Sequence, residues 1–235
     1  MFILQPGTAD LRFPPVELAS PEGLLAVGGD LGAERLLEAY RHGIFPWFNA
    51  GQPILWWSPD PRVVLFPAKL HVSHSLRKTL RQKSFEVTLD SAFRDVIQGC
   101  AHPRRKYPGG GTWITPEMIE AYCVLHERRL AHSVETWREG KLVGGLYGVA
   151  LGNAFFGESM FSQKADASKV AFAHLVRQLD DWGYDFIDCQ LPSNHLFKLG
   201  AEEIRRRDFM SRLEAALQRP NRSGRWCFDT NVVKP

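Results

Sequence analysis

Residues 132–190 constrain the fold most strongly, because two different strand connections must fit into one sheet. Three strand-like runs separated by glycine-containing turns predict an antiparallel meander over 132–139, 141–151 and 153–162. Apolar side chains then recur at helical spacing over 166–183, and an apolar run over 184–190 predicts a buried strand. Strand, helix and strand joined by short links predict a right-handed parallel crossover. We therefore expect an α/β (α+β) fold built on a mixed sheet.

The composition of the chain and the pattern of its predicted elements change after the segment SPDPR. Residues 1–61 are rich in Pro and Gly and contain one predicted amphipathic helix, over 32–43. Strands and helices alternate regularly beyond that point, including a helix that begins with Thr115 as its N-cap. We therefore predict a small N-terminal domain, 1–61, followed by a larger domain, 62–235.

Aromatic residues and prolines are concentrated in residues 41–62, which read RHGIFPWFNAGQPILWWSPDPR. The four prolines remove amide donors and fix φ, so this segment cannot form a regular helix. Its aromatic surface either fills a core between two units or forms a rigid wall for a ligand with a flat face.

Polar side chains interrupt two apolar strands. Asp188 and Gln190 are two residues apart in FIDCQ and would share a face of an ideal strand, as would Glu158 and Met160 in GESMFS. The residues alone leave two interpretations open. The polar groups are either structural, with Glu158 in water at a sheet edge, or they form a ligand site where the sheet opens beside the crossover helix.

Positive charge is clustered although the formal net charge is only +3. One face of the predicted 73–82 helix carries a basic face made of His74, Arg77, Lys78 and Arg81, extended by Lys69 and Lys83. Such a face either lies in solvent or binds phosphates. We also expect a basic loop at 104–106 and a solvated strand end at 205–207.

The four cysteines lie far apart and form no CxxC pair, which favours reduced thiols in a cytoplasmic protein. No signal peptide is evident, and no apolar run reaches the ~20 residues of a membrane span. His71 and His74 have a ligand-like spacing without further ligands nearby, so no metal is expected.

Nine motifs between about residues 23 and 207 are long or unusual enough in combination to point to relatives: GLLAVGGDL, AYRHGIFPWF, ILWWSPDPR, GTWIT, HSVETW, LVGGLYGV, FFGESMFS, ASK and IDCQ. Together they resemble the leucyl/phenylalanyl-tRNA–protein transferase family. The resemblance implies a GNAT-like acyltransferase domain preceded by a small N-terminal domain. It also implies transfer of Leu or Phe from aminoacyl-tRNA to proteins that begin with Arg or Lys, which marks them for degradation by the N-degron pathway.

The resemblance also implies roles for individual residues. Asp188 would orient and polarise Gln190, which hydrogen-bonds the attacking amine, and Glu158 would be the acid of the donor site. Trp47 and Trp113 would grip the terminal adenosine, while Trp56 and Trp57 are expected to seal the domain junction. The pocket for the transferred side chain would comprise Leu146, Phe155, Met160 and Ile187, although an ideal strand would turn Ile187 away from Asp188. The tRNA backbone would be followed by Arg77, Lys78, Arg81 and Lys83.

Aminolysis of an activated ester requires no metal or redox cofactor, so none is expected, and the default oligomeric state is a monomer. An acyl-CoA-dependent N-acetyltransferase is an alternative. It is disfavoured because QKADASK, which follows GESMFS, lacks a glycine-spaced pyrophosphate loop. A non-enzymatic binder of charged tRNA is another alternative. Donor and acceptor preferences, the acceptor side-chain pocket and the group that takes the proton stay open.

Overall fold

The computed structural model describes residues 2–102 and 112–229, and in them the strands form two sheets. The small sheet has the order β1-β2-β4-β3, and the large sheet has the order β11-β5-β10-β9-β8-β7-β6. The small-sheet strands are β1 Phe2–Leu4, β2 Leu24–Gly28, β3 Phe45–Pro46 and β4 Leu55–Trp57. The large-sheet strands are β5 Arg62–Leu65, β6 Glu86–Leu89, β7 Ala131–Arg138, β8 Lys141–Leu151, β9 Ala154–Ser162, β10 Phe186–Gln190 and β11 Glu202–Ile204.

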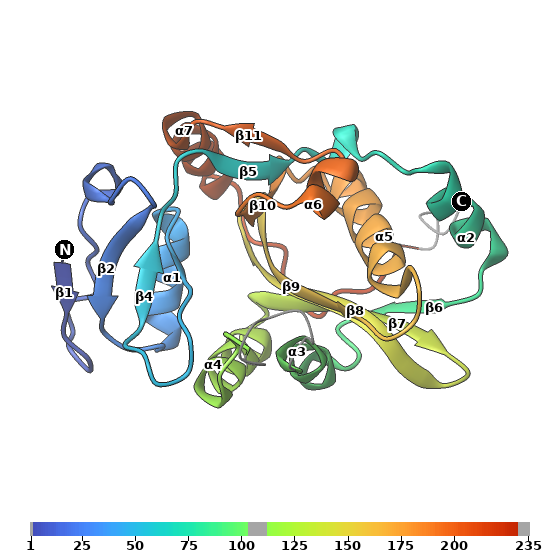
Figure 1. The fold of residues 1–235 in the computed structure, drawn as a ribbon, viewed down its shortest axis with the longest axis horizontal. Coiled ribbons are helices and arrows are strands. Elements are labelled where there is room, and N and C mark those ends of the chain that lie inside the picture. The colour runs from blue at the N-terminus through green and yellow to red at the C-terminus, as the bar shows by residue number, and fades with distance from the viewer. Residues whose placement is uncertain (1, 103–111, 230–235) are drawn as a thin grey trace.

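Helices cover both faces of the large sheet (Figure 1). In Figure 1, α5 lies on one side of the sheet, α3 and α4 lie on the other, and α1 packs beside the small sheet. The α-helices of the described residues are α1 Ala33–Arg41, α2 His74–Gln82, α3 Phe93–Ala101, α4 Pro116–Glu127, α5 Ala167–Asp181, α6 Asn194–Lys198 and α7 Arg206–Leu217. No helix within residues 2–102 and 112–229 has the length and apolar character needed to cross a membrane.

The predicted strand connections are confirmed. Strands β7, β8 and β9 pair antiparallel in chain order, and β9 pairs parallel with β10 across the α5 crossover. Local signals also place the helix starts: the Thr115 side chain accepts a hydrogen bond from the backbone N–H of Met118, and Ser73 caps α2 in the same way. The predicted α/β (α+β) fold is thus confirmed for the mixed sheet and for the parallel crossover.

The sheet opens between β9 and β10. Their parallel pairing ends with Phe156 opposite Asp188, after which β9 stays with β8 and β10 stays with β5. Gln190 lies beyond a register shift and has φ +58°, a left-handed conformation that breaks the alternation of an ideal strand. The two strands therefore part at the position where the sequence carries its polar residues.

Two tryptophans of 41–62 lie next to each other on β4 and pack differently. Trp56 is fully buried, donates from Nε1 to the Gly28 carbonyl at 2.9 Å and packs edge-on against Phe13. Trp57 donates from Nε1 to the Trp47 carbonyl at 2.7 Å, and the two rings lie 5.7 Å apart. Both hydrogen bonds are thus made within the N-terminal segment. Trp56 also belongs to the hydrophobic cluster that contains Phe209 of α7, and Trp57 packs against that cluster.

Helix α7 and the end of α1 meet at the junction between the two sheets. Residues 205–207 are not a solvated strand end, because Arg206 begins α7 and donates from Nη1 to the Ser58 carbonyl at 2.6 Å. Its backbone N–H also donates to Asp60 at 2.9 Å. A single hydrophobic cluster contains Tyr40 and Phe209 together, so one core continues through both sides of the junction.

Candidate active site

A cavity of about 1150 Å³ lies where β9 and β10 part. Its walls come from elements far apart in the chain: the β3 region, the segment before α4, strands β8 to β10, and helices α5 and α6. Open ends of α/β sheets are common ligand sites, because strands that part there leave side chains from several elements facing one space.

One wall of the cavity is apolar. All four residues expected to form the side-chain pocket line it, namely Leu146, Phe155, Met160 and Ile187. Phe172 and Leu175 of α5 line the same wall. Their helical spacing is typical of ordinary core packing, so the sequence gives no separate signal for a role at the cavity.

Glu158 lies partly buried in the cavity wall on β9, held by two tyrosines. Tyr40 of α1 donates to Oε1 at 2.7 Å, and Tyr122 of α4 donates to Oε2 at 3.0 Å. The two phenolic oxygens also lie within hydrogen-bond distance of each other. Because each hydroxyl carries a single proton, a bond between them forms only when one of them no longer donates to Glu158, as when the carboxyl group is itself protonated and donates. The interpretation of Glu158 as a glutamate in water at a sheet edge is therefore wrong.

The surroundings of Glu158 change its acidity. Burial raises its pKa to about 7, against the opposing effect of the two tyrosine hydrogen bonds. Burial and the nearby carboxylate raise the pKa of both Tyr40 and Tyr122, so these side chains act as protonated donors at neutral pH. A carboxyl group with a pKa near neutrality can bind or release a proton during a reaction.

Asp188 is fully buried on β10 and forms an ion pair with Arg62, the first residue of β5. Arg62 Nε donates to Oδ1 at 2.8 Å, and Nη2 donates to Oδ2 at 2.6 Å. Oδ1 also accepts a hydrogen bond from the backbone N–H of Gln190 at 3.0 Å. The sequence marks Arg62 only as the start of a strand, although a buried aspartate in an apolar strand does require a partner.

The predicted shared face of Asp188 and Gln190 is not observed. Gln190 lines the cavity, as do Ile187 and Cys189, whereas Asp188 does not. The left-handed conformation of Gln190 rotates its side chain out of the regular alternation, and its recorded bond to Asp188 is through the backbone. Ile187 does project away from Asp188, as an ideal strand requires.

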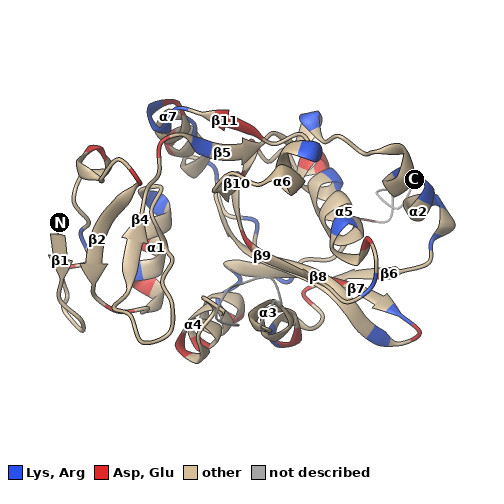
Figure 2. Ribbon diagram, viewed as in Figure 1, with Lys and Arg blue, Asp and Glu red and all other residues tan. Residues whose placement is uncertain are grey.

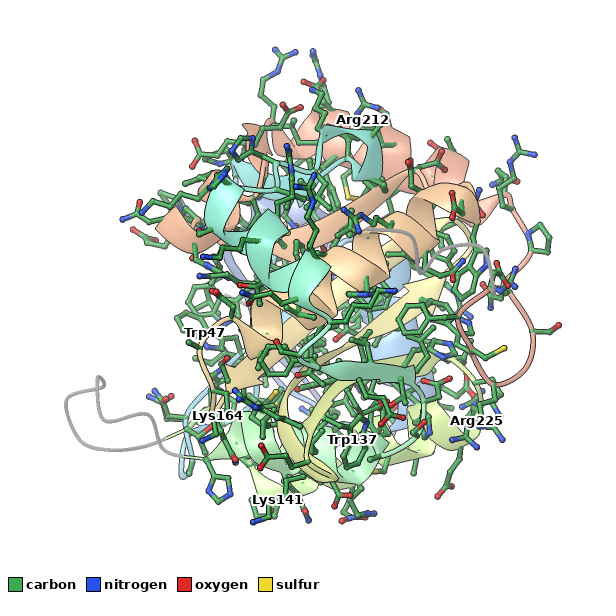
Figure 3. The ribbon with its side chains drawn as sticks, turned by 90° about the vertical axis from the view of Figure 1, so that its right-hand side faces the viewer. Trp47, Trp137, Lys141, Lys164, Arg212 and Arg225 are labelled. Atoms are coloured by element: carbon green, nitrogen blue, oxygen red, sulfur yellow. The ribbon has the colours of Figure 1, made fainter. Side chains whose placement is uncertain are left out.

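Trp47 and Trp113 line the mouth of the cavity from two segments, one next to β3 and one before α4. The Trp47 side chain is 41% exposed and is supported by the Trp57 ring. Figure 3 shows Trp47 and Lys164 on the same side of the molecule, near its edge. An exposed indole held from behind is suited to stacking on a flat ligand.

The basic face of α2 lies outside the cavity. Arg77, Lys78, Arg81 and Lys83 are exposed, whereas Leu76 and Leu80 are buried, as the spacing predicts. Helix α2 packs near the start of α5, where Thr79 donates to Asp166 at 3.3 Å. In Figure 2 the blue segments that mark Lys and Arg occur on the ribbon of α2 and on those of α5 and α6. The basic loop expected at 104–106 lies outside the described residues.

No cluster of three or more His, Cys, Asp or Glu side chains able to hold a metal ion is found in residues 2–102 and 112–229.

The fold and the cavity define an α/β protein with a ligand site at the open end of a mixed sheet. Its residues 64–214 match the family model described as leucyl/phenylalanyl-tRNA protein transferase, and residues 29–60 match the N-terminal domain model of the same enzyme. The chain belongs to the leucyl/phenylalanyl-tRNA–protein transferase family.

Curated relatives of this name are similar over nearly the whole chain. The transferase of Nitrosospira multiformis is 57% identical over 229 residues, 97% of this chain and 98% of that protein. The transferase of Azotobacter vinelandii is 62% identical over 213 residues, 90% of this chain and 93% of that protein. A solved GCN5-related N-acetyltransferase from Kribbella flavida aligns with 75% of this chain and 62% of its own at 13% identity, with a TM-score of 0.37.

Proposed function

We propose that the chain transfers Leu or Phe from aminoacyl-tRNA to the α-amino group of proteins that begin with Arg or Lys, and thereby marks them for degradation by the N-degron pathway. The observation that carries this proposal is the cavity itself. It combines an apolar wall, an exposed indole at its mouth, and the polar groups of Glu158 and Gln190. These are the features that an aminoacyl-adenosine end and an attacking amine require.

The donor would be bound by its two ends. Its Leu or Phe side chain enters the apolar wall, where the flexible thioether of Met160 accommodates either shape. The terminal adenine stacks between the mouth tryptophans, Trp47 and Trp113, which is worth ~1–3 kcal/mol per base. The basic face of α2 contacts phosphates of the acceptor stem without reading base identity.

The acceptor would approach from the polar side of the cavity. Among the described residues that line the cavity, Glu158 carries the only carboxylate, so it is the charge available to a basic acceptor. Gln190 accepts a hydrogen bond from the α-amino group and holds it near the ester carbonyl. A C–N bond forms, the ester C–O bond breaks, and the amine proton finally resides on the released ribose hydroxyl. A neutral amide is a weak base, so we assign positioning rather than proton removal to Gln190.

The proposal extends to the organisation of the protein. Residues 1–61 form a small N-terminal domain that supplies Trp47, and residues 62–235 form the catalytic domain. The protein acts as a monomer in the cytoplasm, where aminoacyl-tRNA is made.

The direct test mixes the purified protein with Leu-tRNA labelled in the amino acid and a peptide that begins with Arg. We expect label in the peptide, and no label in a matched peptide whose α-amino group is acetylated. A parallel reaction with labelled acetyl-CoA tests the alternative N-acetyltransferase activity. Label from acetyl-CoA with none from Leu-tRNA would refute the proposal, and binding of Leu-tRNA without transfer would favour a non-enzymatic binder.

A further inference from the structure

Arg62 occupies an unusual position for a charged residue. Its side chain is 1% exposed, and its fork makes two parallel hydrogen bonds to the carboxylate of Asp188, which is itself fully buried. A bidentate pair of this kind fixes the orientation of both groups as well as their distance. Arg62 does not line the cavity, so its influence on a bound substrate must be indirect.

One route of influence leads through Asp188 to Gln190. The same Oδ1 atom that accepts from Arg62 Nε also accepts from the backbone N–H of Gln190 at 3.0 Å. Gln190 needs this anchor because φ +58° is uncommon for a residue with a side chain. Removing Arg62 would leave the Asp188 carboxylate buried without its main partner, and Gln190 would lose a fixed anchor.

A second route leads to the wall of the cavity mouth. The guanidinium carbon lies 4.8 Å from the ring centre of Phe45 and 4.6 Å from that of Phe209. Phe45 lines the cavity and precedes Trp47 by two residues. The guanidinium group therefore contacts both the segment that carries Trp47 and the carboxylate that anchors Gln190.

We propose that Arg62 is a positioning residue of the transfer reaction, which sets the distance between the adenine-binding wall at Trp47 and the amine-binding residue Gln190. This inference rests on the proposed function, because it takes Trp47 to bind the adenine of the donor and Gln190 to bind the amine of the acceptor. A buried ion pair is often replaceable without loss of stability, so stability alone does not account for the pair.

The first experiment compares Arg62→Lys with Arg35→Lys. Arg35 is an equally buried arginine at 1% exposure, pairs with Asp30 at 3.3 Å and does not line the cavity. A lysine keeps the charge but cannot form the bidentate fork or place a planar guanidinium group over the two rings. We expect Arg62→Lys to lower kcat for transfer to the peptide at least about tenfold, with KM for Leu-tRNA changed less than about threefold. Arg35→Lys should leave both constants near those of the unmodified protein.

A second variant controls for the buried charge. The double substitution Arg62→Met and Asp188→Leu removes both charges together, which buried pairs tolerate better than the loss of one partner. We expect a folded protein, by thermal denaturation, with the same reduced kcat. Unchanged kcat in either Arg62 variant would overturn the proposal. Unfolding of both variants while Arg35→Lys folds would assign Arg62 to stability alone and would also overturn it.

A third measurement needs no substrate. Hydrogen exchange of the Gln190 amide, followed by NMR, should be at least about tenfold faster in Arg62→Lys than in the unmodified protein, because its acceptor has lost its anchor. Unchanged exchange would overturn the inference. Absence of transferase activity in the unmodified protein, together with faster exchange in the variant, would refute the proposed function and leave the link between Arg62 and Gln190 standing.

Discussion

The residue that most clearly depends on its surroundings is Glu158. In the sequence it stands among phenylalanines of a strand, and in the fold it is held by Tyr40 and Tyr122, which lie 118 and 36 residues away along the chain. Burial makes the charged form costly while the two hydroxyl donors reduce that cost, so the pKa moves to about 7 instead of further. The folded protein therefore binds a proton at Glu158 over a pH range in which the unfolded chain has released it.

This difference predicts a pH-dependent stability. Because the folded pKa of about 7 exceeds the usual 4.5, Glu158 destabilises the fold progressively as pH rises from about 4.5 to 7. Glu158→Gln removes that effect. The variant should therefore gain about 2 kcal/mol of stability relative to the unmodified protein between pH 5 and pH 8. Urea denaturation at both pH values measures it. Glu120→Gln is the control, because Glu120 is exposed on α4 and its pKa is lowered. An equal pH effect in both variants would contradict the prediction.

At the scale of single elements, helix α2 and strand β10 behave differently. The alternation of basic and apolar residues in α2 places its leucines in the core and its charges in solvent, as expected of an amphipathic helix. Strand β10 follows its expected alternation only up to Asp188, after which the register shift turns Gln190 toward the cavity. A helix face is set by local spacing, whereas a bulge depends on which strands lie on either side.

The basic face of α2 carries the prediction at this scale. Replacing Arg77, Lys78 and Arg81 together by Ala should raise KM for Leu-tRNA about tenfold and reduce the slope of log KM against log salt by roughly 2. The buried Leu76 and Leu80 are untouched, so the fold should persist. The control replaces three other exposed basic residues, Arg129, Arg138 and Lys141, and should leave the salt slope unchanged. Equal slopes for the two triple variants would show that the basic face of α2 lies in solvent and does not contact tRNA phosphates.

At the scale of the whole molecule, the site exists because two sheets share one core. Tyr40 and Phe45 come from the N-terminal segment, and each meets partners of the large sheet or its helices. The end of α1 approaches α7 closely: a Cβ at Gly43 would lie 2.7 Å from Met210 Sδ and 2.9 Å from the Phe209 ring. Gly43 also has φ +68°, so both space and backbone require glycine there.

This contact predicts an asymmetry between two glycines. Gly43→Ala should lower the free energy of unfolding by about 2–3 kcal/mol, because it adds a clash at the α1–α7 contact to the cost of positive φ. Gly51→Ala is a matched control with φ +81° and no atom within 4 Å, and it should cost only about 1 kcal/mol. Chemical denaturation of both variants measures the difference. Equal destabilisation of the two variants would contradict the prediction and would show that α7 moves to accommodate the added methyl group.

Much of the fold could be predicted from local pattern. The meander, the crossover and the capped starts of α2 and α4 follow from spacing, turn residues and caps within a few positions of each other. The small sheet was missed, because its strands are short and interrupted by Pro and Gly. The hydrogen-bond partners of Trp56 and Trp57 could not be predicted either, since the pairing of β4 between β2 and β3 decides which way each ring points.

The sequence by itself determined the periodic elements and the basic face of α2, because each depends on neighbours close in the chain. The apolar residues of the cavity wall were expected only from the family resemblance, since they lie on three different strands. Only the tertiary structure decided which polar groups meet. Arg62 reaches Asp188 across 126 residues, and it does so because β5 lies next to β10 in the large sheet. Sheet order and the parting of β9 from β10 are properties of the whole core, so no local pattern could specify the partners that give Glu158 and Gln190 their chemistry.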